Sequence, residues 1–154
     1  MDLHSAPVIG DIGPRPDGLD VPFWAGLAEG RLLLQRCGAC ATWIWGPQWV
    51  CPRCRTLEPG WDEVPLRGTV YSWTRTWQPF VPSFKEHLPY VTLLIELPDA
   101  GGRRILGLLI DDDGTTDPVI GEDVAGVIQP ASDVTSGVPV LRWTRGRTAT
   151  EGDA

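Results

Sequence analysis

The chain has few basic residues, few histidines and no long apolar segment. Of its 154 residues, 13 are Lys or Arg and 20 are Asp or Glu, which gives a formal net charge of -7. Nucleic-acid binding depends on a general attraction to phosphates, so this acidic balance disfavours it. No stretch approaches the roughly 20 apolar residues of a membrane-spanning helix, and the start of the chain lacks the pattern of a signal peptide. We therefore expect a cytoplasmic protein without membrane contact.

The residue patterns that usually carry catalysis are also scarce. The two histidines are His4 and His87, and an isolated loop histidine is usually solvated. The sequence contains no Gly-x-Ser-x-Gly elbow, no phosphate-binding glycine loop and no His-Glu-x-x-His helix. Its carboxylates are scattered and are not spaced as an acid/base pair. We expect a chain that is not catalytic alone.

In contrast, the chain has one dense cluster of cysteines. Cys37 and Cys40 form one C-x-x-C unit, Cys51 and Cys54 form another, and ten residues separate the two units. This spacing suits a hairpin that brings four thiolates to one ion, and Zn²⁺ takes four thiolates tetrahedrally at about 2.3 Å. Because the protein fills every ligand position, the predicted zinc is structural. Iron in a rubredoxin-like site and a redox dithiol are the alternatives.

Composition divides the chain into four predicted segments. Residues 1–20 carry several prolines and glycines without periodic apolar residues, which indicates a flexible arm. Residues 21–62 are predicted to form a short helix and the zinc ribbon, and residues 63–146 a barrel. The polar residues 147–154 are predicted to be a flexible tail.

A short amphipathic helix is predicted at the start of the second segment. Asp20 stands where an N-cap belongs, and Gly30 can end the helix in a left-handed conformation. Phe23, Trp24 and Leu27 can share one face. We expect this face to be buried.

Five strand-like segments follow the ribbon. They are predicted at residues 68–77, 90–97, 104–110, 124–129 and 138–144. Apolar residues on both faces of the segment 90–97 indicate a central strand. Five short antiparallel strands in about 80 residues fit an OB-like barrel best, although the count equally allows an SH3-like barrel.

Two connections between these segments stand out. The acidic run 111–117 is predicted to be a surface turn, because its carboxylates are too costly to bury unpaired. The connection 78–89 is long for a barrel loop, and its Phe80 and Phe84 look exposed. Long apolar loops are often functional, so we expect a contact surface there.

Three alternating residues suggest a ligand or partner contact. Trp73, Arg75 and Trp77 lie two apart along one predicted strand, so their side chains share a face. Such a face can bind CoA or a partner, with the arginine holding a phosphate or adenine between two indoles. The equally weighted alternative is that the tryptophans are core residues and Arg75 lies at the rim.

Two arginine pairs are further candidates. Arg53 and Arg55 border the second cysteine unit, and Arg103 and Arg104 begin a predicted strand. Either pair can meet phosphates or the carboxylates of a partner, and the alternative is that both are simply solvated.

Several short motifs occur in a characteristic order between about Phe23 and Arg145. They are Phe23-Trp24 with Leu27 and Gly30, Leu34-Gln-Arg-Cys37-Gly-Ala-Cys40, Cys51-Pro-Arg-Cys54, Trp61, Gly68-Thr-Val-Tyr71-Ser-Trp73-Thr, Pro89-Tyr-Val and Leu106-Gly107. Each motif is weak alone, but their order and spacing are specific. Together they resemble a family of zinc-ribbon plus OB-fold proteins that are associated with acyl-CoA and were first described as a domain of unknown function.

The resemblance implies a mainly β protein, with an N-terminal helix and rubredoxin-like zinc ribbon followed by a five-stranded OB-fold barrel. It also implies an accessory subunit in a hetero-oligomer with a thiolase-superfamily protein, such as an aldolase or thiolase of steroid side-chain degradation or other fatty acyl-CoA metabolism. The small subunit then stabilises its partner and helps to accommodate the CoA thioester, without supplying the nucleophile. A nucleic-acid-binding module and a free-standing acyl-CoA carrier are the competing functions.

Overall fold

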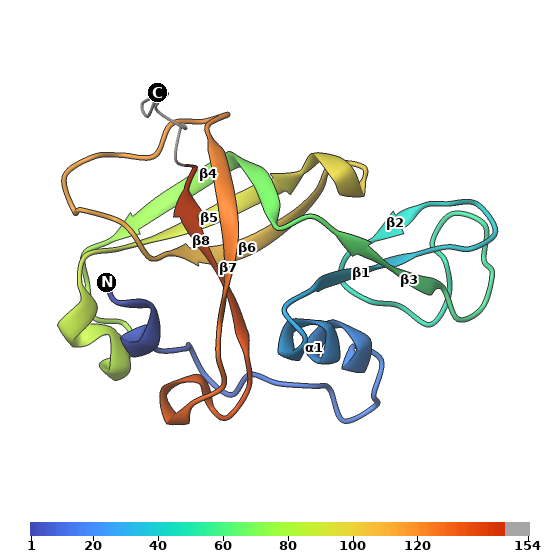
Figure 1. Ribbon diagram of the computed structural model, residues 1–154, viewed down its shortest axis with the longest axis horizontal. Coiled ribbons are helices and arrows are strands. Elements are labelled where there is room, and N and C mark those ends of the chain that lie inside the picture. The colour runs from blue at the N-terminus through green and yellow to red at the C-terminus, as the bar shows by residue number, and fades with distance from the viewer. Residues whose placement is uncertain (147–154) are drawn as a thin grey trace, which may run out of the picture.

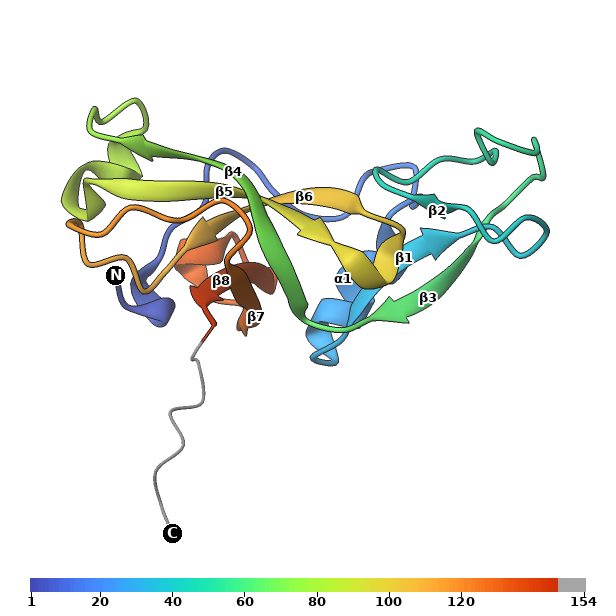
Figure 2. The same cartoon turned by 90° about the horizontal axis from the view of Figure 1, so that it is seen from above.

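The computed structural model describes residues 1–146 and contains two β-structures. One is a three-stranded sheet with the strand order β2-β1-β3, and the other is a closed barrel with the order β4-β5-β6-β8-β7. The small sheet projects from one end of the barrel, and α1 lies between the two (Figures 1 and 2). The predicted fold class, a mainly β chain with a helix, a zinc ribbon and a five-stranded OB-fold barrel, is confirmed.

The small sheet and its helix come first in the chain. They consist of α1 (Val21–Ala28), β1 (Leu32–Arg36), β2 (Trp43–Ile44) and β3 (Gly60–Val64). The barrel strands are β4 (Arg67–Thr76), β5 (Tyr90–Leu97), β6 (Arg103–Leu109), β7 (Asp123–Gln129) and β8 (Val140–Arg145). Short 3-10 helices lie at Leu3–Ser5, Pro82–His87, Pro98–Ala100 and Asp133–Thr135. Within residues 1–146, no helix has the length and apolar character needed to cross a membrane.

Helix α1 lies where the sequence predicts it, but its first turn is not capped as expected. Gly30 has a φ of 77°, which ends the helix in the left-handed conformation. The side chain of Asp20 makes no capping hydrogen bond. Its carboxylate instead accepts hydrogen bonds from the backbone N–H of Arg15 at 2.7 Å and from Nε1 of Trp24 at 3.1 Å. Asp20 therefore fixes the indole that follows it.

The sequence does not predict strand β3. Asp62 and Glu63 interrupt its apolar pattern, so this segment reads as a loop. In the structure β3 pairs antiparallel with β1 from Gly60 to Val64 and lies at the edge of the small sheet, where both charged side chains are exposed. Charged residues on an edge strand protect it from pairing with another chain.

The barrel is least complete between β6 and β8. These parallel strands pair at one register position, Leu109 with Trp143, whereas β5 pairs along its length with both β4 and β6, as its central pattern predicts. Phe23 and Leu27 on α1 pack into the core beside this seam. An apolar groove of about 380 Å³ remains between the helix and the two strands.

Gly107 makes room for the largest fully buried side chain among the described residues. Trp143 is completely buried, and a Cβ at Gly107 would collide with the Cδ1 and Nε1 atoms of its indole. The motif Leu106-Gly107 therefore has a packing reason. A side chain at this position forces the indole or the backbone of β6 to shift.

A buried arginine connects the start of the chain to the barrel. Nη2 of Arg142 donates to the backbone carbonyls of Ala6, at 3.1 Å, and Pro7, at 2.6 Å, and its Nε donates to Gln129 at 2.8 Å. Burial lowers the pKa of Arg142 to about 10, so the guanidinium is still charged at neutral pH. The predicted boundaries of the arm and the two domains stay predictions, and the predicted tail, residues 147–154, lies outside the described residues.

Candidate metal centre and neighbouring surface

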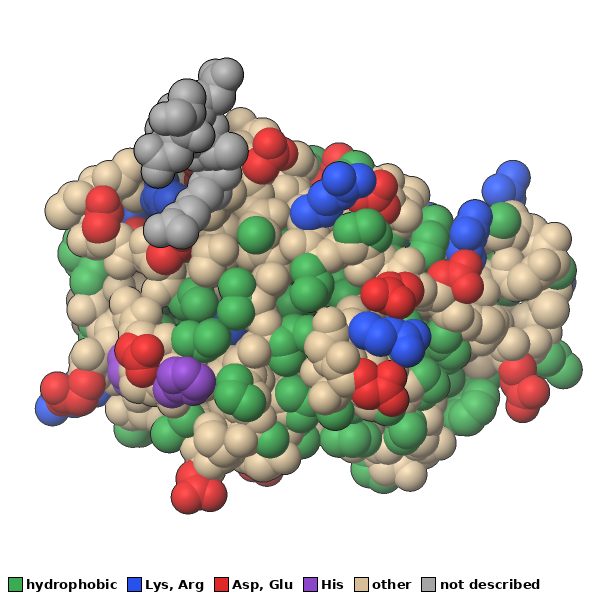
Figure 3. Space-filling view, in the orientation of Figure 1, with side chains coloured by type: hydrophobic (Ala, Val, Ile, Leu, Met, Phe, Trp, Pro, Cys, Tyr) green, Lys and Arg blue, Asp and Glu red, His purple; other side chains and the backbone are tan. Residues whose placement is uncertain are grey.

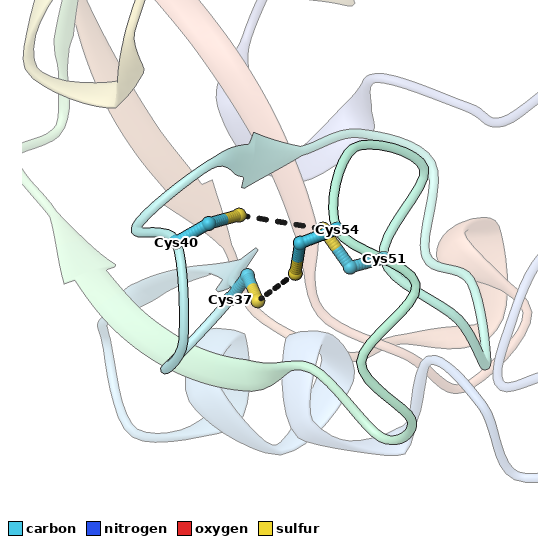
Figure 4. A group of neighbouring side chains, drawn as sticks. All are labelled: Cys37, Cys40, Cys51 and Cys54. Atoms are coloured by element: carbon cyan, nitrogen blue, oxygen red, sulfur yellow. Dashed lines mark hydrogen bonds between the residues drawn. The ribbon is translucent and has the colours of Figure 1, made fainter.

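The four cysteines converge at one end of the molecule. Their Sγ atoms all lie within 4.8 Å of one another (Figure 4). The distance is 3.5 Å between the sulfurs of Cys37 and Cys54, and 3.7 Å between those of Cys40 and Cys51. Four thiolates placed tetrahedrally at about 2.3 Å from Zn²⁺ are roughly 3.8 Å apart. The cysteines are therefore positioned for zinc binding in a zinc ribbon.

Both cysteine units have the same local backbone structure. The backbone N–H of Cys37 donates to the carbonyl of Thr42 at 2.9 Å, and that of Cys51 donates to the carbonyl of Thr56, also at 2.9 Å. Each unit thus reads C-x-x-C-x-Thr and closes into a tight knuckle. In such a knuckle the first cysteine and the second face the same point, as four-thiolate coordination requires.

The residue after each second cysteine takes a left-handed conformation. Its φ is 59° at Ala41 and 65° at Arg55. This conformation is unfavourable for residues with a Cβ, and it is usually stabilised by the surrounding structure. Here the turns are held by hydrogen bonds to the carbonyls of Cys37, at 2.8 Å, and Cys51, at 3.0 Å.

Two threonine hydroxyls favour the thiolate form that a metal needs. Oγ1 of Thr42 lies 3.1 Å from Sγ of Cys40, and Oγ1 of Thr56 lies 3.1 Å from Sγ of Cys54. These hydroxyl contacts lower the pKa of Cys40, and they lower that of Cys54 to about 6. A bound Zn²⁺ would join the two knuckles through Cys37, Cys40, Cys51 and Cys54, with no coordination position left for a substrate.

The three alternating residues Trp73, Arg75 and Trp77 differ in exposure and do not form one exposed surface. Trp73 packs against the barrel core, as the alternative interpretation has it. The side chain of Arg75 is only 6% exposed, so it is not a rim charge. Trp77 lies just beyond the end of β4 and is exposed. A role of these residues in CoA or partner contact stays a prediction.

Arg75 is held by the acidic loop that follows β6. Its two terminal nitrogens donate to the carboxylate of Asp112, whose side chain is also 6% exposed, and Nη2 donates to the carbonyl of Thr116 at 3.2 Å. The expectation of a purely surface turn is therefore wrong at Asp112, because Arg75 pairs with the buried carboxylate. Nothing in the sequence near either residue signals this pairing, since 37 residues separate them.

The long connection before β5 folds into the 3-10 helix Pro82–His87. The prediction that Phe84 is exposed is wrong: the side chain is 2% exposed, and its ring centroid lies 4.7 Å from that of Tyr90. Phe80 is exposed as expected. Sequence alone does not show the helical turn that directs one phenylalanine inward and leaves the other outside.

The two arginine pairs also differ. Arg104 donates to Glu96 at 3.0 Å and stacks over the ring of Tyr71, so its guanidinium is already paired with barrel residues. Within residues 1–146, neither Arg53 nor Arg55 forms an ion pair, and both are exposed. The second knuckle therefore presents two available guanidinium groups.

A four-cysteine zinc ribbon joined to an OB-fold barrel defines the structural class of this protein. Two family models match the chain in adjoining stretches. The model of the ChsH2 rubredoxin-like zinc ribbon domain matches residues 24–59, and that of the ChsH2 C-terminal OB-fold domain matches residues 61–129. The chain belongs to the ChsH2 family, whose domain is also called DUF35.

Two relatives are similar in sequence. A probable enoyl-CoA hydratase alpha subunit of Thermomonospora curvata is 39% identical over 101 residues, which cover 63% of this chain and 30% of the relative. The chain thus spans less than a third of that protein. A DUF35 domain-containing scaffold protein of Methanocaldococcus jannaschii is 31% identical over 97 residues, covering 62% of this chain and 67% of the relative.

Two solved structures are similar in fold. One is an Ltp2-ChsH2(DUF35) aldolase, with a TM-score of 0.71 and 25% identity over 86% of this chain and 98% of the matched chain. The other is a DUF35-family protein of unknown function from Sulfolobus solfataricus. It has a TM-score of 0.56 and 18% identity, over 86% of this chain and 87% of the other, and supports the fold alone.

Proposed function

We propose that this chain is the zinc-binding accessory subunit of a thiolase-superfamily aldolase or thiolase that acts on acyl-CoA thioesters. The observation that carries the proposal is the match to a chain of the Ltp2-ChsH2(DUF35) aldolase, which extends over 98% of that chain. Because the likeness includes both the ribbon and the barrel, it is a likeness of the whole folded unit. The name of that structure supports an aldolase as the partner.

The use of the cysteines supports an accessory role. The chain has 4 cysteines in all, and their sulfurs converge on one centre. A thiol that ligates zinc is not free to act as the acyl-accepting nucleophile on which thiolase chemistry depends. The structural metal would supply the fold of the ribbon, and the partner would supply the reacting groups.

The proposed substrates are acyl-CoA thioesters of steroid side chains or of other fatty acids. The name of the Thermomonospora curvata relative, an enoyl-CoA hydratase subunit, supports acyl-CoA metabolism. In this role the chain stabilises its partner and helps to accommodate the thioester. The exposed side chains of Trp77 and Phe80, next to the end of β4, are candidates for that contact.

Affinity purification of the tagged chain from its native host tests the proposal. We expect a thiolase-superfamily protein in near-stoichiometric amount, identified by mass spectrometry, and about one zinc ion per chain. The chain alone should not cleave acyl-CoA substrates, whereas the co-expressed pair should. Co-purification of nucleic acid, or tight acyl-CoA binding by the chain without any partner, would replace the proposal with one of the two competing functions.

A further inference from the structure

Positive charge is concentrated in one part of this acidic chain. Residues 31–57 contain four arginines, and all 20 Asp and Glu residues lie outside that range. Arg31 and Arg36 each form ion pairs at 3.2 Å with carboxylates of neighbouring segments. Arg53 and Arg55 are the two arginines of the range that have no such partner among the described residues. Figure 3 shows basic side chains at the ribbon end of the molecule.

Exposed apolar residues flank these two arginines along the chain. Trp49 is 50% exposed and Leu57 is 71% exposed, and Val50 beside them is exposed as well. All of them belong to the hairpin that carries the second knuckle, and we call residues 49–57 the ribbon tip. Burying exposed side chains of this size in water-free contact is favourable by about 25 cal/mol for each Å² of apolar surface.

The ribbon tip is held in a fixed shape. Val50 and Leu57 form an antiparallel bridge, and the backbone N–H of Glu58 donates to the carbonyl of Trp49 at 2.8 Å. Cys51 and Cys54, two of the four residues of the cysteine site, lie in the same hairpin. A surface that is already ordered loses little conformational entropy on association, so its contacts count almost fully toward affinity.

We propose that the ribbon tip docks onto an apolar patch of the partner enzyme that is rimmed by carboxylates. Val50 and Leu57, whose side chains share one face of the bridge, enter the patch, and Arg53 and Arg55 face the rim. Arginine is among the residues that most often dominate interface energies, and charge complementarity guides the approach of such surfaces. This inference rests on the proposed function and names the surface by which the chain finds its enzyme.

A protein face fits the ribbon tip better than a nucleic acid does. Two unpaired cations are few for a phosphate backbone, which proteins usually neutralise with many contacts. The remaining chain carries all 20 acidic residues and would repel a long polyanion. An acidic protein patch of limited size avoids that repulsion.

Two pairs of matched variants test the inference on the complex of this chain with the aldolase or thiolase that co-purifies with it. Arg53→Glu changes the ribbon tip, and Arg103→Glu makes the same change of charge at an exposed position of the barrel. Leu57→Ser removes an apolar side chain from the ribbon tip, and Val119→Ser removes one from an exposed barrel loop. Zinc content and thermal unfolding show whether each variant is folded.

We expect both ribbon-tip variants to raise the Kd at least about tenfold, and both controls to change it less than about threefold. The effect of Arg53→Glu should shrink as NaCl is raised, whereas that of Leu57→Ser should not. Hydrogen exchange on the unmodified complex should show protection of residues 49–57. This measurement applies even if a variant fails to fold.

Different failures overturn different conclusions. If the enzyme binds all four variants equally and residues 49–57 gain no protection, the docking surface is wrong and the accessory role stands. If the unmodified chain binds no thiolase-superfamily protein, both the docking surface and the proposed function are wrong. Binding of an oligonucleotide through the ribbon tip would also overturn the inference.

Discussion

Removal of the metal should unfold the two cysteine knuckles and leave strand β1 and the barrel intact. The buried cluster at the cysteine site consists of Cys37, Ile44 and Cys51, with Cys40 packed against it. Ile44 is its one side chain that does not belong to a cysteine. Burial of such an aliphatic side chain contributes about 1.5–3 kcal/mol, whereas structural zinc contributes about 10–16 kcal/mol to the folding of small zinc fingers at neutral pH. The metal therefore dominates the stability of this region.

The structure also indicates where the unfolding should stop. Leu32 and Leu34 of β1 are completely buried and belong to the main core cluster together with barrel residues. Strand β1 should therefore stay folded without metal. Trp43 and Trp45, which lie between the two cysteine units, also pack against this core. The knuckles at residues 37–42 and 51–56 have no such support among the described residues, and they should lose their structure together.

Hydrogen exchange measured by mass spectrometry can check this prediction on the holo protein and on protein treated with a strong chelator. Amides of the two knuckles, residues 37–42 and 51–56, should lose protection, while those of β5, the central barrel strand, should keep it. Substitution of the metal by Co²⁺ should give the thiolate charge-transfer absorption of a four-sulfur site. Full protection of the two knuckles in verified metal-free protein would refute the view that the metal holds them.

Three further predictions concern the barrel. Asp112→Ala should lower the free energy of unfolding by about 3 kcal/mol in urea titrations, because it removes the buried partner of the buried Arg75. Asp117 also pairs with Arg75 but is exposed, so Asp117→Ala should lower the free energy of unfolding by less than about 1 kcal/mol. Gly107→Ala should cost about 1–3 kcal/mol by the same assay, because the added methyl collides with a buried indole, and an unchanged midpoint would contradict this packing. Backbone N–H groups hold the pKa of Asp113 well below its usual range, so this carboxylate stabilises the fold above about pH 4, and its contribution is lost as the pH falls further. Asp113→Asn should therefore flatten the acid side of the profile of unfolding free energy against pH. An identical profile would refute the stabilising role of this carboxylate.

The parts of the fold that depend on local patterns could be read from the sequence. The cysteine spacing defines the ligand set, because four thiolates in two short units have one geometrically simple way to meet. Alternating apolar residues such as Leu93 and Ile95 locate the central strand, since period-two burial is a local property. These features require no knowledge of which segments become neighbours.

The features that were missed depend on pairing between distant segments. Strand β3 carries Asp62 and Glu63 and becomes a strand because β1 offers a hydrogen-bonding edge to it. Asp112 is buried only because Arg75 reaches it across the barrel end. In each case the local sequence favours the wrong answer, and the correct one follows from a partner whose position the topology decides.

The ribbon and the barrel are stabilised in different ways, and this difference determines what their surfaces can do. The barrel buries its large side chains, such as Trp143, because apolar burial is what holds it together. The cysteine knuckles are held by the metal site, and the apolar side chains at the ribbon tip are not among those that pack against the main core. Trp49 and Leu57 can therefore stay exposed without loss of stability to the hairpin that carries them. A metal-folded hairpin is thus well suited to present a rigid apolar surface to a partner.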